Sequence, residues 1–328
     1  MLNPYEGVDW TNTEYLHSVN HEHTFAPNTG GETWREGERG WEPQEVFDSL
    51  YYHGIRHFAI SNYHPSKPTY PLADFFEEVP VDVIGCPNAE HTGTRGHYCA
   101  VGSTFESASR GFQGDWQDLF DGLLEELSYD GGGGIIINHP RRSGFSFEDL
   151  TDRFTYDDRI IGIEAWNHRG VVLPKYRSRG NALSTWDELL SAGVDCFGFF
   201  NPDYHTRWDW TRAGHPPRGR NVLLVEEQSE SAAALAYREG RCFGALDGSG
   251  LRFEHIDASN GQVKVETDRE AYISWISCGQ VIASTMGTSA KYELTGGEPY
   301  IRIEAADETG ERIFSQPIRF PEHDWQDE

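Results

Sequence analysis

The sequence predicts an α/β fold: a barrel built from β/α units, followed by a small all-β domain. From about residue 15 to about residue 245, short strand-like runs alternate with segments of helical periodicity, a pattern typical of mainly parallel sheets. Beyond the segment "REGRCFGALDGSG" only alternating, strand-like patterns remain. A chain of 328 residues is long enough for one large and one small domain. We therefore expect a first domain at residues 1–245 and a second at 246–328.

The first domain is expected to contain seven or eight β/α units, the number that closes a barrel. Its strand-like runs are rich in β-branched and aromatic residues and lie at 15–20, 57–61, 81–86, 97–102, 134–138, 160–166, 196–200 and 221–225. Helical periodicity is found between them at 43–53, 116–128, 186–192 and 229–239. Ser229 or Ser231 is a suitable N-cap for the last helix.

The second domain is expected to be antiparallel. Alternating runs read "RFEHIDA", "QVKVET", "AYISWIS", "YIRIEAAD" and "RIFSQPIRF". Turn signals separate them at Asn260-Gly261, Gly296-Gly297 and Thr309-Gly310. Because no helical pattern interrupts these runs, we expect a small β-sandwich.

The charge balance is strongly acidic. Asp and Glu number 53 against 27 Lys and Arg, which gives a formal net charge of −26. Self-repulsion of this size destabilises a compact chain unless salt screens it, so we expect a protein from a salt-loving, haloarchaeal source; an ordinary acidic protein is the alternative. The same charge disfavours nucleic acid as a partner.

The cysteines and the apolar runs indicate a cytoplasmic protein. The five cysteines are scattered, without a Cys-x-x-Cys pair, as expected of reduced, buried thiols. The first residues, "MLNPYEGVDW", do not have the pattern of a signal peptide, and no apolar run approaches the length needed to span a bilayer. We expect no membrane association.

Side chains that can bind metals follow most of the predicted strands. "VNHEHT" places His21 and His23 two residues apart, so that both point to one face of an extended segment. The carboxyl ends of barrel strands meet at one face, where barrel enzymes build their sites. Each histidine alone could be a surface group, but their repeated placement favours a shared site. The candidate ligands are His21, His23, His64, Glu90, His97, His139, Asp203 and His205.

Eight ligands require at least two cations, because a catalytic zinc uses three protein ligands. Imidazole and carboxylate without thiolate suit zinc, manganese or iron better than calcium. Two such ions can hold a bridging hydroxide and stabilise both oxygens of an in-line displacement at phosphorus.

These motifs resemble the PHP (polymerase and histidinol phosphatase) superfamily of metal-dependent phosphoesterases. "NHEHT" is similar to its H-x-H-T, "NAEHTGTRGH" to its G-x-E followed by G-H, "INHP" to its H-P, and "NPDYH" to its final S-D-x-H. "IEAWN", with Glu164 and Asn167, looks like the strand that follows H-P. The resemblance implies a distorted (β/α)7 barrel, two or three metal ions and hydrolysis of phosphate esters.

The chain departs from the family pattern at two places. The family's T-D-H is replaced by Ser61-Asn62-Tyr63-His64, and an aspartate that often follows H-x-H-T falls near Asn28. A third metal is therefore less well supported than the first two. The tail resembles PHP-like hydrolases with a C-terminal β-domain, a subgroup that also includes carbamate and aryl ester cleavage.

The expected reaction is hydrolysis of a small, phosphorylated molecule. His205 or His64 is the candidate for proton transfer, and Arg141 is the candidate for holding phosphate through its guanidinium. Two alternatives remain open: an aryl ester, amide or carbamate hydrolase using the same site, and a metal-binding protein with weak catalysis. The sequence leaves the oligomeric state open.

Overall fold

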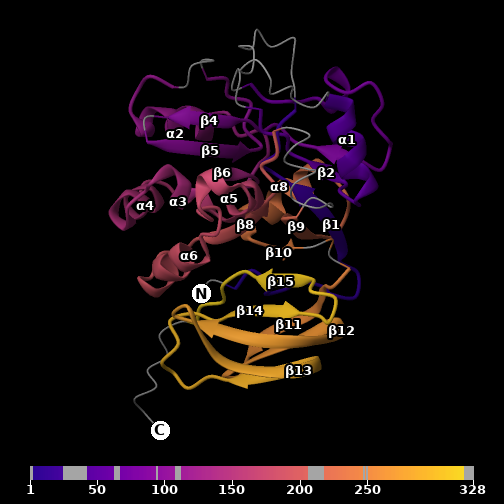
Figure 1. Cartoon of the computed structure of the whole chain (residues 1–328), viewed down its shortest axis with the longest axis vertical. Coiled ribbons are helices and arrows are strands. Elements are labelled where there is room, and N and C mark those ends of the chain that lie inside the picture. The colour runs from indigo at the N-terminus through magenta and orange to yellow at the C-terminus, as the bar shows by residue number, and fades with distance from the viewer. Residues whose placement is uncertain are drawn as a thin grey trace.

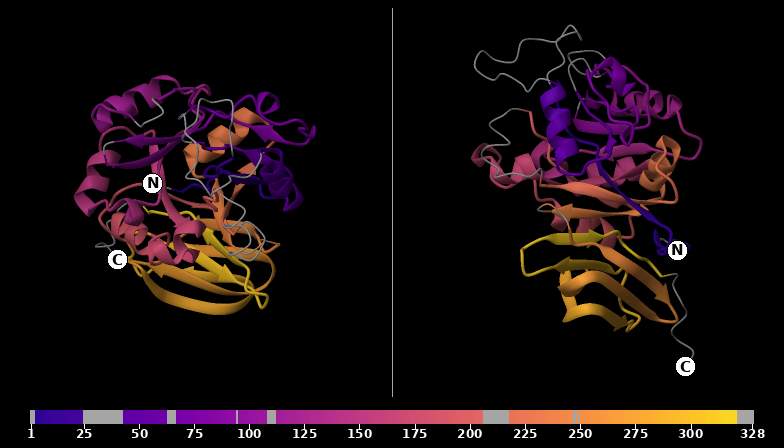
Figure 2. Two further views of the ribbon diagram at one scale, coloured as in Figure 1. Left: turned by 45° about the horizontal axis from the view of Figure 1, so that its top comes forward. Right: turned by 90° about the vertical axis from the view of Figure 1, so that its right-hand side faces the viewer.

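The protein has a mixed α/β architecture in the computed structural model, which agrees with the predicted fold class (Figure 1). The structure describes residues 3–24, 43–62, 67–93, 95–107, 112–205, 218–246, 248 and 250–320. Helices and short strands occupy the upper part of Figure 1, and the long C-terminal strands occupy the lower part. In both views of Figure 2 the C-terminal strands stay together on one side of the helical part.

The first of two sheets begins with the strand that precedes the His-x-His motif. Strand β1 pairs in parallel with β2, which pairs in parallel with β3. On its other side β1 pairs antiparallel with β9, and β9 pairs antiparallel with β10. The bounds are β1 Glu14–Val19, β2 His57–Phe58, β3 Ile84–Gly85, β9 Arg220–Val225 and β10 Cys242–Leu246. Every residue of β9 and β10 is buried, including the polar pair Arg220 and Asn221 at the start of β9.

The second sheet has five strands in the order β4-β5-β6-β7-β8. The pairs β4-β5 and β5-β6 are antiparallel, whereas β6-β7 and β7-β8 are parallel. The bounds are β4 Glu90–Gly93, β5 Gly96–Val101, β6 Gly134–Ile137, β7 Ile160–Asn167 and β8 Phe197–Asn201. Strand β4 was not predicted, because its four residues are mostly polar.

Single contacts, not strand ladders, join the two sheets. The Asn221 side chain accepts from Phe200 N at 3.0 Å and donates to Phe200 O at 3.2 Å, so it takes the place of a ladder between β8 and β9. At the other edge, Glu90 N donates to Ser61 O at 3.0 Å. Because the described strands form two separate ladders, the closed barrel is not confirmed.

Seven α-helices surround the sheets in the described residues. Their bounds are α1 Pro43–Tyr52, α2 Trp116–Glu125, α3 Pro140–Ser143, α4 Phe147–Phe154, α5 His168–Val172, α6 Leu183–Ser191 and α8 Glu230–Glu239, with 3-10 turns at Leu72–Asp74 and Pro174–Tyr176. The four predicted helices are confirmed as α1, α2, α6 and α8. Ser229 caps α8 by accepting from Ala232 N, and Gly240 ends it in the left-handed conformation. No helix in the described ranges is long and apolar enough to cross a membrane.

The C-terminal strands are antiparallel, as predicted. Their bounds are β11 Phe253–Ser259, β12 Gln262–Ser277, β13 Gln280–Glu293, β14 Arg302–Ala306 and β15 Arg312–Ser315. Asn260 and Gly261 both have positive φ, at 51° and 71°, which fits the predicted Asn-Gly turn between β11 and β12. The inner face of these strands packs into one apolar cluster that includes Val263, Ile273 and Trp275.

These strands extend the first sheet across the predicted domain boundary. Strand β15 pairs antiparallel with β10, so the sheet runs from β1 through β9 and β10 into β15, β14 and β12. Asp187 of α6 also forms a buried ion pair with Arg302 of β14 at 2.8 Å. The separate sandwich is therefore not confirmed, and the boundary near residue 246 stays a prediction.

Candidate metal centre

Loops at the ends of several strands bring the predicted ligands to one place. His21 and His23 follow β1, His139 follows β6 and Asp203 follows β8, while Glu90 opens β4. All five side chains are buried. Burial of this many ionisable groups in one cluster is costly unless they are paired or bind cations.

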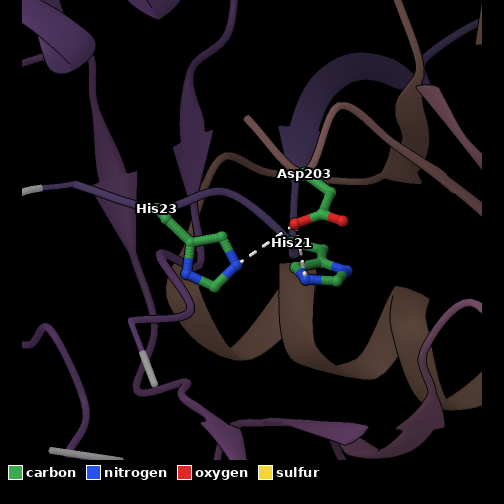
Figure 3. A group of neighbouring side chains, drawn as sticks. All are labelled: His21, His23 and Asp203. Carbon is green, nitrogen blue, oxygen red and sulfur yellow. Dashed lines mark ion pairs between the residues drawn. The ribbon is translucent and has the colours of Figure 1, made fainter. Parts of the chain in front are cut away.

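One group consists of His21, His23 and Asp203 (Figure 3). Nε2 of His21 and Nε2 of His23 both lie 3.3 Å from Oδ1 of Asp203. In Figure 3 the two imidazole rings converge on this carboxylate from different directions. The His-x-His spacing therefore places two nitrogens around one oxygen, as predicted for a shared site.

A second group consists of His21, Glu90 and His139. Oε1 of Glu90 lies 3.2 Å from His139 Nε2, 3.2 Å from His21 Nε2 and 2.8 Å from His97 Nδ1. The other oxygen, Oε2, lies 3.4 Å from His23 Nε2. Glu90 therefore faces histidines of both groups: Oε1 faces His21, His97 and His139, and Oε2 faces His23.

Glu164 of β7 forms hydrogen bonds to two residues of the cluster. It is fully buried on β7, and its Oε1 lies 2.9 Å from Nδ1 of His21. Its Oε2 accepts from the backbone N of His139 at 2.8 Å. A carboxylate on Nδ1 fixes the ring orientation and leaves Nε2 as the coordinating atom. The "IEAWN" motif contained this residue, but its role became visible only from the contacts.

Asn167 and Arg142 hold the carboxylates of the cluster. The Asn167 amide donates to Glu164 Oε2 and to Asp203 Oδ2, both at 2.9 Å. Arg142 donates to Asp203 Oδ2 at 2.8 Å. With Oδ2 satisfied twice, Oδ1 of Asp203 is left to face His21, His23 and His205, each at 3.3 Å. Arg142 was not among the predicted site residues, although it neighbours Arg141.

The backbone conformation of two ligands is strained. His139 and Asp203 have φ of 29° and 54°, where side chains other than glycine are disfavoured by roughly 1–2 kcal/mol. Asp203 N donates to His21 O at 3.0 Å, and His23 N donates to Tyr204 O at 3.2 Å. These bonds join the segments after β1 and β8 and hold the Asp203 turn against the cluster, whereas the His139 turn is held by the bond from its backbone N to Glu164 Oε2.

The charges of the cluster are strongly coupled. Burial lowers the pKa of His21, but the carboxylates of Glu164, Asp203 and Glu90 outweigh it and raise this pKa well above its usual value. Burial opposes ionisation of Glu90 and Asp203, yet the surrounding histidines hold both pKa values well below the usual range. Burial lowers the pKa of His139 to about 4. Ionised carboxylates and neutral imidazoles are the forms that bind metal ions, so a cation at Nε2 of His21 would displace a proton that the neighbouring carboxylates favour.

His205 and His97 also contact carboxylates of the cluster: Nδ1 of His205 lies 3.3 Å from Oδ1 of Asp203, and Nδ1 of His97 lies 2.8 Å from Oε1 of Glu90. The ring of His205 lies with its centroid 4.0 Å from that of His23, and its Nδ1 is 3.1 Å from Asp203 O. The side chain of His97 is 29% exposed. His64 and Asn28 lie outside the described residues. Asn62 accepts from Thr24 N at 2.8 Å and donates to Thr24 Oγ1 at 2.9 Å.

Arg141 is not brought into the cluster. It is exposed, and its guanidinium donates to Asn181 O at 2.6 Å. It lines a separate cavity of about 570 Å³, together with Asp187 and Arg302. Its role in holding phosphate stays a prediction.

The residues present fit a divalent cation. His21 Nε2 and Asp203 Oδ1 are both buried and form no regular hydrogen bond within the described residues. Imidazole nitrogens and carboxylate oxygens, without thiolate, form the donor set expected for zinc, manganese or iron. Within each of the two groups, the candidate ligand atoms all lie within 4.8 Å of one another. This spacing is compatible with one ion bound by each group.

Comparisons with known proteins leave the family undecided. No family model matches the chain, and no curated protein matches it. One solved structure, from Bacteroides vulgatus ATCC 8482, is described as a two-domain protein containing a predicted PHP-like metal-dependent phosphoesterase. It is 12% identical, with 98% of this chain and 91% of that chain covered and a TM-score of 0.49. At this level of likeness, the function of the present chain has to be inferred from its own residues.

Proposed function

We propose that the protein is a PHP-type, metal-dependent phosphoesterase that binds two divalent cations. The observation that carries this proposal is the pair of buried ligand groups, His21–His23–Asp203 and His21–Glu90–His139. The order of motifs along the chain supports it independently, because these residues stand in segments that resemble the PHP motifs.

The ligands divide between two ions in one chemically reasonable way. His21 belongs to both groups, but its Nε2 can bind only one ion. We therefore assign His21, His23 and Asp203 to the first ion, and His97 and His139 to the second. Glu90 would serve both, because its two oxygens face different histidines. A third ion would need His64, and it is proposed only as an extension of this pair.

Two divalent cations would supply Lewis acidity and an activated water at neutral pH, the chemistry that ester hydrolysis at phosphorus needs. The protein residues position this chemistry. Glu164 orients His21, Asn167 and Arg142 orient Asp203, and the strained turns at His139 and Asp203 fix the ligand directions. His205, which lies beside His23 and Asp203, is proposed to assist proton transfer to the leaving group.

The substrate is proposed to be a small phosphorylated molecule. A net charge of −26 repels long polyanions, whereas a small phosphate ester is attracted locally by the bound cations.

The proposal is tested by turnover of p-nitrophenyl phosphate and bis-p-nitrophenyl phosphate by protein loaded with zinc, manganese or iron. We expect His139→Ala and Asp203→Asn to lower turnover by a factor of at least about 100, as expected when a metal ligand is lost. The control is His255→Ala, because His255 lies on β11 in the C-terminal strands. Turnover of p-nitrophenyl acetate without turnover of phosphate esters would favour the ester hydrolase instead. Tight metal binding without turnover of any of these compounds would contradict catalysis.

A further inference from the structure

We propose that the interior of the protein next to the metal centre binds at least one ordered water molecule, held by the side chains of Asn20, Asn88 and Asn201. All three residues are completely buried. Asn20 directly follows β1, Asn88 precedes β4 and Asn201 ends β8, and each stands one or two positions before a candidate metal ligand. The water site itself does not depend on the proposed function, because it is built from atoms that are not metal ligands.

The three amides belong to one hydrogen-bonded group around Asn20. The backbone N of Asn20 donates to Asn201 Oδ1 at 3.2 Å, and its backbone O accepts from Asn88 Nδ2 at 2.8 Å. Its side-chain Oδ1 accepts from Asn221 Nδ2 at 3.0 Å. Because every member of the group contacts Asn20, the amides lie close together in one part of the interior.

The bonded atoms determine which end of each amide is oxygen and which is nitrogen. Asn88 contacts two backbone carbonyl oxygens, so its bonded atom is the donor Nδ2. Asn201 accepts from the backbone N–H of Asn20, so its bonded atom is Oδ1. Asn221 accepts from Phe200 N through its Oδ1, so its Nδ2 is the atom that donates to Asn20 Oδ1.

The opposite end of each of the three amides forms no hydrogen bond within the described residues. These unbonded atoms are Nδ2 of Asn20, Nδ2 of Asn201 and Oδ1 of Asn88, which are two donors and one acceptor. Buried polar atoms in folded proteins are bonded either to protein or to ordered water. A buried water typically forms about three hydrogen bonds to such atoms, and it can accept from two donors while it donates to an acceptor.

Water matches these atoms better than an ion does. The amides are uncharged, and a metal cation would need oxygen ligands where two of the three atoms are N–H donors. An anion would need donors where the third atom is a carbonyl oxygen. The surroundings are polar as well, since Tyr237 Oη lies 3.5 Å from Asn20 Oδ1 and 2.7 Å from Ser18 Oγ. A molecule that both donates and accepts satisfies all three atoms.

The water connects three segments that carry candidate metal ligands. Asn20 belongs to the segment after β1 in the first sheet, Asn201 to β8 in the second sheet, and Asn88 to the connection between β3 and β4. No strand ladder in the described ranges pairs any two of these segments directly. Hydrogen bonds through the water therefore add to the few direct contacts that hold the segments together.

A crystal structure of the full chain, at a resolution that shows ordered waters, tests the proposal directly. We expect a water oxygen within about 2.7–3.2 Å of at least two of the three unbonded atoms. A structure in which these atoms have no water within this distance, or bond to one another instead, overturns the proposal.

A pair of variants tests the same site in solution. Magnetic relaxation dispersion of water measures how many waters stay inside a protein for longer than the protein takes to tumble. With the full chain in metal-free buffer, Asn201→Leu should lower this number by about one, because leucine has a similar size but no donor. The matched control is Asn62→Leu: Asn62 is also buried, but both ends of its amide are bonded, to Thr24 and Thr69, so the number should stay the same.

A folded Asn201→Leu variant that keeps the wild-type number of internal waters overturns the proposal, and so does an equal loss in both variants. If Asn201→Leu does not fold, the crystal structure of the wild type decides.

Discussion

Replacing Glu164 with Gln should weaken metal binding although Glu164 is not itself a ligand. The carboxylate accepts three hydrogen bonds, from His21 Nδ1, His139 N and Asn167 Nδ2, at 2.8 to 2.9 Å. An amide offers one oxygen and one NH₂ group in the same space. The oxygen is expected to keep the two donors at Oε2, so the NH₂ group faces His21 Nδ1.

That arrangement reverses the tautomer of His21. To accept from the new amide, Nδ1 must lose its proton, and the neutral ring then carries its proton on Nε2. Nε2 is the atom that faces Asp203 and Glu90 at 3.3 and 3.2 Å, where the cation should sit. Loss of an orienting carboxylate typically costs a factor of 10 to 100 in metal affinity, which corresponds to roughly 1.4–2.7 kcal/mol.

Isothermal titration of metal-free protein with zinc or manganese measures this change, and Glu125→Gln on the exposed face of α2 is the matched control. Glu164→Gln should bind 10 to 100 times more weakly than the wild type, by the estimate for an orienting carboxylate. An affinity within a factor of about two of the wild type would refute the idea that Glu164 sets the tautomer of His21.

Three further predictions concern stability. Burial lowers the pKa of His57 to about 3, so the unfolded chain binds the proton more tightly and stability falls as the pH drops below about 6.5. Denaturant titrations at pH 7 and pH 5 give the free energy of unfolding at each pH. Between these two values the His57→Gln variant should lose about 2 kcal/mol less of this free energy than the wild type; an unchanged pH dependence would contradict this. Asp187→Ala leaves the buried Arg302 with Glu304 as its remaining carboxylate partner among the described residues, and should lower the free energy of unfolding by about 3 kcal/mol. Asp195→Ala, at an exposed ion pair, should change it by less than about 1 kcal/mol; equal effects would be inconsistent with a buried pair. Finally, the net charge of −26 predicts that the free energy of unfolding rises between about 0.1 and about 2 M salt, and a flat or falling dependence would remove the argument for salt adaptation.

The elements of the fold were predictable where the local pattern was strong. The helix that ends at Glu239 had a serine cap, apolar periodicity and a following glycine, and the structure places it at Glu230–Glu239. Strand β4 and the short helices α3 and α5 were missed, because four or five residues are too few to show a period. Helix α4, with eight residues, was missed as well, although Ser146 and Asp149 form a capping box at its start. The continuation of the first sheet into β15 depends on pairing between residues about 70 positions apart, which no local pattern contains.

The site divides in the same way. The His-x-His motif, Glu90, His139 and Asp203 could be selected because strand ends converge, and the structure brings them together. The contacts that orient them were not accessible from the sequence. Arg141 and Arg142 are neighbours in the sequence, yet Arg141 is exposed and donates to Asn181 O, whereas Arg142 donates to Asp203 Oδ2. Which of the two turns inward depends on the conformation of α3.

The number of cations bound per chain is the most direct test of the paired metal centre. Equilibrium dialysis with manganese or zinc, followed by elemental analysis, should give two ions for the wild type and one each for His23→Ala and His139→Ala. Glu90→Ala should lose affinity for both ions, because its two oxygens face histidines of both groups. A wild-type protein that binds fewer than two ions, or a Glu90→Ala variant that retains both at wild-type affinity, would contradict the account.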